Sequence, residues 1–171
     1  MSVYPPREDT YFLKNYLESL ELEGMEVLEV GCGSGILSVA MAGKGAEVTA
    51  VDINPEAVEA TREAAEEAGV EVDVFRSDLF REVEDKFDLI VFNPPYLPGR
   101  ELEGDEKWRG GDRGVEVTER FLQDYGKHLK EGGKALFLLS SLSDHRELLR
   151  KHEVVESENL WFETLYLVRG E

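Results

Sequence analysis

The feature that most constrains the fold of this chain is a regular alternation of short β-rich runs with helical patterns, which begins at Met25. Such alternation is typical of βαβ units, in which parallel strands form one sheet and the connecting helices cover its faces. The pattern therefore predicts an α/β fold with a doubly wound, mostly parallel sheet.

The boundaries of the expected elements follow from periodicity and from helix end signals. We expect strands at Val27–Val30, Glu47–Val51, Val70–Phe75, Asp88–Phe92 and Lys134–Leu139. We expect helices at Ile36–Gly43, Pro55–Ala68 and Val115–Leu129, with Gly69 as a cap and Gly132-Gly133 as a sharp exit. A helix near Ser143–His152 and strands near Val154–Ser157 and Leu160–Val168 should follow.

The length of 171 residues, of which 42% are hydrophobic, is enough for one domain with a buried core. We expect a single domain over residues 1–171, made of an N-terminal helical cap (1–24) and an α/β core (25–171). The cap contains an expected helix, Asp9–Leu20, whose apolar stripe should pack on the core. The members of this stripe are Phe12, Leu13, Tyr16, Leu17 and Leu20.

The formal net charge of −18 repels a phosphate backbone, which argues against a nucleic acid substrate. The charge is spread along the chain, so it indicates a solvated surface or an acidic surface suited to high salt. The longest apolar run, Ala135–Leu139, is far too short to cross a bilayer, and no secretory signal pattern precedes it. With Cys32 as the lone cysteine, we expect a cytoplasmic protein without disulfides and without a membrane partner.

A glycine-rich run, Glu29–Gly35, stands where the first strand should turn into the first helix. Glycines there let the backbone approach a ligand at the carboxyl edge of the sheet, although a tight turn without a ligand has the same composition. Asp52 ends the second strand about 20 residues further on, where an acid can accept hydrogen bonds from ribose hydroxyls. NAD would use the same acid, but Gly31, Gly33 and Gly35 lie two apart, unlike the third glycine of the dinucleotide fingerprint.

This spacing resembles the E-x-G-x-G-x-G turn of class I S-adenosylmethionine-dependent methyltransferases, whose loop faces the amino acid part of the cofactor. The resemblance implies S-adenosyl-L-methionine as cofactor and a seven-stranded, Rossmann-like sheet with an antiparallel C-terminal strand. Glu29 would bond to the turn or to the charged end of the cofactor. Ser77-Asp78-Leu79 resembles the place where this class sets an acid beside the adenine amine, and the alternative for Asp78 is a helix cap or a solvated loop acid.

The most specific motif, Asn93-Pro94-Pro95-Tyr96, follows the fourth strand at the same edge of the sheet. The Asn93 side-chain oxygen and the Pro94 carbonyl can accept hydrogen bonds from a target NH₂ group and draw positive charge as it forms there. Tyr96 offers a flat face for a planar group, and Pro95 belongs to the same substrate contact. No side-chain base is needed, because the proton can leave after methyl transfer. The alternative is a rigid turn that closes a strand.

With this motif the chain resembles the N5-glutamine methyltransferases, and within them the short release-factor branch of archaea and eukaryotes. The segment Val3–Phe12 resembles the Val-Tyr-x-Pro-x-Glu-Asp-Thr opening of that branch, which implies that Thr10 contacts the cofactor, with Asp9 and Tyr4 as secondary candidates. The alternative is a capped helix start, with Asp9 or Thr10 bonded to the first turn.

The segment Trp108–Val117 resembles the Trp-x-Gly-Gly-x-x-Gly loop of the same branch, which implies that Trp108 walls the substrate pocket. Arg109 and Arg113 could steer an acidic or polar peptide, and the alternative is a glycine-rich surface loop. The resemblance implies the glutamine of the Gly-Gly-Gln loop of a translation termination factor as substrate.

The resemblance further implies a small zinc-binding activator subunit that forms a heterodimer at the sheet edge. The expected third strand should be an edge strand that could accept such a partner, unless Glu71 and Asp73 guard it as an unpaired edge. Within the chain itself no metal site is expected, because the cysteine and histidines are scattered. The histidines are His128, His145 and His152.

Four other functions compete with this interpretation. An adenine-N6 or cytosine-N4 nucleic acid methyltransferase would use the same motif, but the charge and the lack of a basic groove argue against it. Methylation of another protein acceptor, such as lysine, is a further alternative. A non-catalytic S-adenosylmethionine-binding partner protein would tolerate a degraded motif, whereas this motif is intact. An NAD oxidoreductase conflicts with the glycine spacing.

Overall fold

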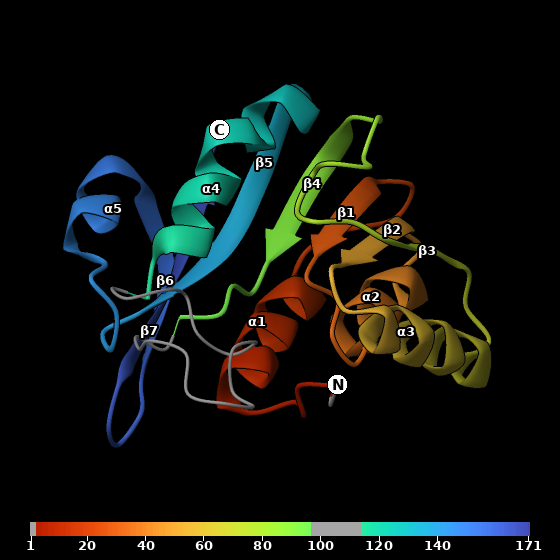
Figure 1. Cartoon of the computed structure of the whole chain (residues 1–171), viewed down its shortest axis with the longest axis horizontal. Coiled ribbons are helices and arrows are strands. Elements are labelled where there is room, and N and C mark those ends of the chain that lie inside the picture. Colours follow the sequence, from red (N-terminus) through yellow and green to blue (C-terminus); the bar gives the residue numbers. More distant parts are fainter. Residues whose placement is uncertain (1–2, 97–113) are drawn as a thin grey trace.

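One sheet of seven strands runs through the computed structural model, which describes residues 3–96 and 114–171 (Figure 1). The strand order is β3-β2-β1-β4-β5-β7-β6. Strands β1 to β5 pair in parallel, whereas β7 runs antiparallel to both β5 and β6. The strands are β1 (Glu26–Val30), β2 (Glu47–Asp52), β3 (Val72–Arg76), β4 (Phe87–Phe92), β5 (Leu129–Ser140), β6 (Glu153–Asn159) and β7 (Thr164–Gly170). The predicted doubly wound, mostly parallel sheet with an antiparallel C-terminal strand is confirmed.

The helices cover the two faces of this sheet as separate layers (Figure 1). On one face lie α1 (Glu8–Ser19), α2 (Ile36–Gly43) and α3 (Pro55–Ala68), and on the other lie α4 (Glu116–Asp124), the 3₁₀ turn Tyr125–His128 and α5 (Arg146–Lys151). The predicted apolar stripe of α1 packs into the core as expected, with Leu13 and Leu17 fully buried. In the described ranges, no helix has the length and apolarity that crossing a membrane requires.

The ends of α3 agree with the sequence signals. Pro55 occupies the first turn of α3, where its missing N–H costs nothing, and the Asn54 side chain accepts a 3.2 Å hydrogen bond from the Glu56 amide. Gly69 caps the other end in the left-handed conformation with φ of 67°. Local chemistry therefore fixes where this helix begins and ends.

Gly132 and Gly133 do not end a helix, contrary to the sequence-based expectation. The helix α4 already ends at Asp124, and both glycines lie inside β5, which is longer than predicted. Gly132 has φ of 76°, and a Cβ atom on Gly133 would lie 2.8 Å from the Phe87 carbonyl oxygen. The register between β4 and β5 shifts between Phe87 and Leu89, so the glycine pair allows an irregular start of this strand pair.

The strand order reverses direction between β1 and β4, which places a topological switch point between them. Val30, the last residue of β1, pairs with Phe92, the last residue of β4. The glycine-rich loop after β1 and the Asn93–Tyr96 motif after β4 therefore start side by side. A crevice at such a point is where open α/β sheets bind ligands.

Candidate active site

A cavity of about 560 Å³ opens at the carboxyl ends of β1, β2, β3 and β4. Segments from four strand ends and from the start of α1 meet in its walls. Among the residues that the sequence motifs indicated, its lining includes Tyr4, Asp9, Thr10, Glu29, Gly31, Gly33, Asp52, Asp78, Asn93, Pro94, Pro95 and Tyr96. Sequence positions spread over more than half of the chain are thus brought to one place.

The glycine-rich loop adopts a backbone path that only glycine follows without strain. Gly31, Gly33 and Gly35 have φ of 71°, 53° and 79°. The Gly31 amide donates a 2.7 Å hydrogen bond to the Val51 carbonyl, which ties the loop to the end of β2. No atom lies within 4 Å of where a Gly33 Cβ would stand, so the backbone of the loop borders open space on the cavity side.

Gly35 has a different role from Gly31 and Gly33, because it does not line the cavity. A Cβ atom on Gly35 would lie 2.8 Å from the Thr61 Cα atom, which is backbone of α3 and cannot move aside. The Thr61 hydroxyl in turn donates a 3.3 Å hydrogen bond to the Gly33 carbonyl. Gly35 therefore permits the close packing of α2 against α3 that supports the loop.

Asp52 is held in the cavity wall by backbone amides. Its two carboxylate oxygens accept hydrogen bonds from the Gly33 amide at 3.0 Å and from the Asn54 amide at 2.8 Å. These bonds connect the end of β2 to the glycine-rich loop and to the start of α3. The carboxylate is thereby fixed at the position where the sequence predicts contact with the ribose hydroxyls of an adenosine.

Glu29 is a buried acid at the base of the cavity, with 2% of its surface exposed. The Ser38 hydroxyl of α2 donates a hydrogen bond to its Oε2 atom. Burial raises the pKa of Glu29 to about 8, and the negative charge of Asp52 adds to the shift, while the Ser38 bond opposes it. A cationic group in the cavity would favour the ionised carboxylate, as expected for the charged end of S-adenosylmethionine.

Asp78 belongs to the cavity lining and forms an ion pair with another lining residue. The Arg120 guanidinium of α4 donates a 2.8 Å hydrogen bond to the Asp78 carboxylate. The following residue, Leu79, has a positive φ of 52°, and the Ser77 hydroxyl donates to its carbonyl at 2.8 Å. Strained backbone of this kind is common at ligand sites. Arg120 was missed by the sequence analysis, because nothing in its helical position distinguishes it from other exposed arginines.

The Asn93–Tyr96 motif, called the acceptor motif below, contributes a buried side-chain oxygen. The Asn93 Oδ1 atom is buried and accepts no hydrogen bond from the described residues. Pro94 is buried beside it, and Tyr96 is half-buried. Burial, followed by the negative charges of Asp9 and Glu163, raises the pKa of Tyr96 well above its usual range, so its hydroxyl stays protonated. A buried oxygen that accepts no hydrogen bond destabilises the folded protein, unless a ligand donates a hydrogen bond to it.

Three residues with predicted roles at the substrate pocket lie outside the described ranges. Trp108, Arg109 and Arg113 fall among residues 97–113, so their predicted roles stay predictions. Burial raises the pKa of the Cys32 thiol far above its usual range, which makes a thiolate nucleophile unfavourable. No cluster of potential metal ligands occurs in the described part of the chain.

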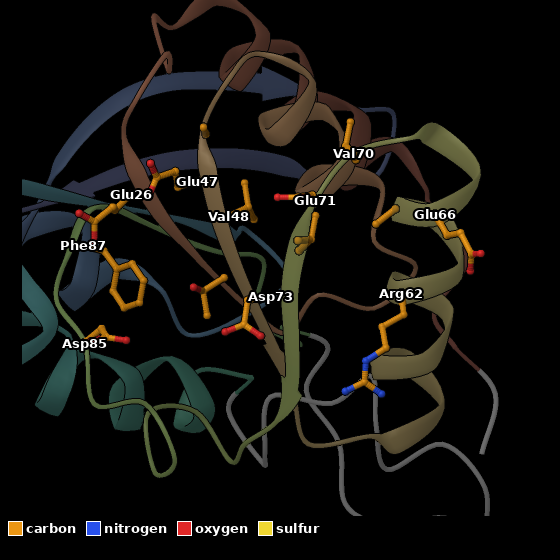
Figure 2. Close-up of a pocket in the computed structure, with 14 residues that line it drawn as sticks. Glu26, Glu47, Val48, Arg62, Glu66, Val70, Glu71, Asp73, Asp85 and Phe87 are labelled. Carbon is orange, nitrogen blue, oxygen red and sulfur yellow. The ribbon is translucent and has the colours of Figure 1, made fainter.

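A second hollow, of about 840 Å³, lies at the opposite ends of the strands. We call it the β3-edge hollow, and its lining includes the first residues of β1, β2 and β4 together with β3 and one side of α3. Figure 2 shows Arg62 and Glu66 of α3 on one side of β3, and Glu26, Glu47 and Asp85 on the other. It contains none of the predicted site residues, and ligands of parallel sheets bind at the carboxyl ends, so the smaller cavity is the candidate active site.

Comparison with known proteins identifies methyltransferases, the class of protein that the sequence motifs resemble. The sequence matches the protein family described as "Methyltransferase small domain" over residues 9–161. A Methanocaldococcus jannaschii protein, to which the name protein N5-glutamine methyltransferase is assigned, is 41% identical over 155 residues, which cover 87% of this chain and 78% of that protein. Methyltransferase HEMK2 of Homo sapiens is 41% identical over 134 residues, which cover 70% of this chain and 63% of HEMK2.

Two further similar proteins are named as ribosomal RNA methyltransferases. Ribosomal RNA small subunit methyltransferase C of Escherichia coli is 32% identical over 136 residues, or 76% of this chain and 36% of that protein. The Thermus thermophilus 16S rRNA N2 G1207 methyltransferase, solved with AdoMet and guanosine, superposes with a TM-score of 0.75 over 98% of this chain and 43% of that one. At 21% identity, this second likeness shows the fold alone.

The sheet topology, the glycine-rich loop and the acids at the strand ends define an S-adenosylmethionine-dependent methyltransferase of class I. The chain belongs to the methyltransferase small domain family, and its relatives include the N5-glutamine methyltransferases that the sequence motifs indicated. The cofactor is S-adenosyl-L-methionine, and three acids for which the sequence predicts contacts with it, Asp52, Asp78 and Glu29, line this cavity.

Proposed function

We propose that this methyltransferase modifies the side-chain amide nitrogen of a glutamine, and that its substrate is the Gly-Gly-Gln glutamine of a translation termination factor. The observation that carries the proposal is the buried Asn93 Oδ1 atom, which lacks a partner among the described residues and stands beside the cofactor loop. The glutamine methyltransferase named among the relatives supports the choice of acceptor.

The chemical difficulty is that an amide nitrogen is neutral and its lone pair is delocalised. S-adenosylmethionine, when bound, supplies a methyl group on a positively charged sulfur. The Asn93 oxygen and the Pro94 carbonyl would accept hydrogen bonds from the target NH₂ and so hold its nitrogen toward the cofactor cavity. The same two oxygens would stabilise the positive charge that develops on the nitrogen. Tyr96, whose hydroxyl stays protonated, would pack its ring against the planar amide.

The acceptor geometry alone would also accommodate an exocyclic amine of a nucleobase, and the relative named as a ribosomal RNA methyltransferase makes that the second candidate. Charge favours the protein substrate. A net charge of −18 disfavours binding to a polyanion such as RNA.

The activity is tested by mass spectrometry of a termination factor incubated with S-adenosylmethionine and the enzyme, with the activator subunit present. We expect one added methyl group on the Gly-Gly-Gln glutamine, lost in Asn93→Ala. Asn159→Ala is the matched control, because it makes the same change at an exposed residue near the β6–β7 turn. Methyl transfer to ribosomal RNA, with none to the protein, would contradict the proposal.

We further propose that the β3-edge hollow receives the small zinc-binding activator subunit, which would make the active form a heterodimer. β3 is an outer strand of the sheet, so one side of its backbone has no neighbouring strand in the described part of the chain and can pair with a strand of a partner. Glu47, Glu71 and Asp73 line this hollow and would favour a partner with basic residues at the contact.

The partner proposal is tested by size-exclusion chromatography of the mixed subunits. We expect the double variant Glu71→Arg and Asp73→Arg to lose co-elution. Glu63→Arg and Glu67→Arg together are the control, because they make the same charge change on exposed positions of α3 outside the hollow. Equal co-elution of both double variants would contradict the placement of the partner.

A further inference from the structure

One hydrogen bond links the acceptor motif to the N-terminal helix. The Asn93 Nδ2 atom donates to the Asp9 Oδ2 atom at 3.0 Å, although the two residues stand 84 positions apart in the sequence. Asp9 is the second residue of α1 and only 3% of its surface is exposed. A carboxylate in the first turn of a helix usually faces solvent, so the burial of Asp9 against Asn93 requires an explanation.

The bond decides which way the Asn93 amide points. An ionised carboxylate can only accept hydrogen bonds, so it can pair with the NH₂ side of the amide and not with its oxygen. The oxygen must then face the other way, and this Oδ1 atom is the buried acceptor without a partner among the described residues. If the amide rotated by half a turn, Oδ1 would approach the carboxylate and the target NH₂ would meet a donor instead of an acceptor.

Asp9 is itself held in place. The Thr10 hydroxyl donates to the Asp9 Oδ1 atom at 3.3 Å, and the Tyr4 hydroxyl lies 3.5 Å from both carboxylate oxygens. The helix that carries Asp9 is anchored to the sheet by Leu13 and Leu17, which are completely buried. The carboxylate therefore has a fixed position relative to the end of β4.

We propose that Asp9 is a positioning residue for methyl transfer, which locks the Asn93 amide with its oxygen toward the acceptor NH₂. Only the Asn93 side chain would separate the Asp9 carboxylate from the reacting nitrogen. The negative charge of Asp9 would therefore also stabilise the positive charge that develops on that nitrogen. The inference rests on the proposed acceptor chemistry of Asn93, but it holds for any planar amine and does not depend on the identity of the substrate.

A purely structural role for Asp9 makes a different prediction. Acids in the first turn stabilise a helix through its dipole, and Glu8 shares that turn with Asp9 but is exposed. Glu8→Gln is therefore the matched control, because it removes a first-turn charge without touching Asn93. If Asp9 only stabilised α1, Asp9→Asn and Glu8→Gln would have similar effects.

The first experiment measures the kinetics of methyl transfer from S-adenosylmethionine to the termination factor. It compares the full-length wild type with Asp9→Asn, Asp9→Ala and Glu8→Gln. We expect kcat to fall by about tenfold or more in both Asp9 variants, since a charge-assisted bond that fixes the acceptor is lost. The dissociation constant of S-adenosylmethionine, measured by calorimetry, should stay within about threefold. An unchanged kcat in a folded Asp9→Asn protein would overturn the proposal.

The second experiment observes the amide directly and needs no turnover. The chain contains four asparagines, so labelling asparagine side chains with ¹⁵N gives few NH₂ signals, and the Asn93 pair is assigned by its loss in Asn93→Ala. We expect the hydrogen-bonded Asn93 proton to move upfield in Asp9→Asn and to stay in place in Glu8→Gln. If the Asn93 signals are the same in Asp9→Asn and wild type, the proposal fails even where glutamine is not the substrate.

Discussion

Replacing Glu29 by glutamine should change how both stability and cofactor affinity depend on pH. Burial raises the pKa of Glu29 from 4.5 to about 8, so the folded protein keeps a proton that the unfolded chain has lost between these values. One pKa unit corresponds to about 1.4 kcal/mol, so the difference between pH 4.5 and pH 8 is of the order of 5 kcal/mol. The glutamine side chain would keep the shape of the neutral acid and its bond with Ser38, without this dependence.

The sign of the stability effect follows from proton binding. Because the pKa is raised in the folded state, the contribution of Glu29 is fully present below pH 4.5 and is lost as pH rises through about 8. Urea unfolding of wild type and Glu29→Gln at several pH values measures it, since other titrating groups are common to both proteins. We expect the variant to gain stability relative to wild type at up to about 1.4 kcal/mol per pH unit in this window.

Cofactor affinity should move in the opposite direction. A cationic ligand favours the carboxylate, so S-adenosylmethionine binding to wild type should release a proton and strengthen as pH rises toward 8. Calorimetry in two buffers of different ionisation enthalpy counts the released proton, and Glu29→Gln should release none. Equal proton release by wild type and variant, with the same stability difference at about pH 5 and about pH 8, would refute the raised pKa and its link to the cofactor.

Three other predictions concern packing and charge. Gly35→Ala should destabilise the protein by about 2–4 kcal/mol in urea unfolding, because it combines a positive φ with overlap on Thr61, whereas Gly33→Ala, with open space, should cost only about 1–2 kcal/mol. Equal losses would contradict the contact with Thr61. Arg120→Ala should change stability by less than about 1 kcal/mol, since its ion pair with Asp78 is largely exposed, but should weaken cofactor binding measured by calorimetry. Raising NaCl to molar concentration should raise the unfolding midpoint, because salt screens the repulsion of a net charge of −18, and no rise would contradict a destabilising surface charge.

The parts of the fold that could be predicted are those that local chemistry determines. Pro55, Asn54 and Gly69 mark the ends of α3 by their own backbone preferences, and the structure places these ends where the sequence signals stand. The cavity could be predicted for a related reason. Loops that follow parallel strands meet at one edge, so the glycine-rich loop and Asp52 had to lie together once the strands were found.

What could not be predicted depends on contacts between distant residues. Gly132 and Gly133 have the composition of a helix exit, but the same freedom of φ serves a strand irregularity, and only the pairing of β4 with β5 decides between them. Arg120 pairs with Asp78 because α4 packs against the sheet and brings the two lining residues together. No local pattern at either residue encodes that packing.

The helix α1 connects the two halves of the site, and this has a consequence for catalysis. Thr10 lines the cofactor cavity, while the neighbouring Asp9 bonds to Asn93 of the acceptor motif, and the two side chains bond to each other. A displacement of α1 would therefore move the cofactor wall and the acceptor oxygen together. If Asp9 positions Asn93 as proposed and Thr10 contacts the cofactor as predicted, one helix would align both reactants, and fewer independent parts would have to be aligned for methyl transfer. On this proposal the buried leucines of α1 would contribute to the alignment of the reactants as well as to the stability of the fold.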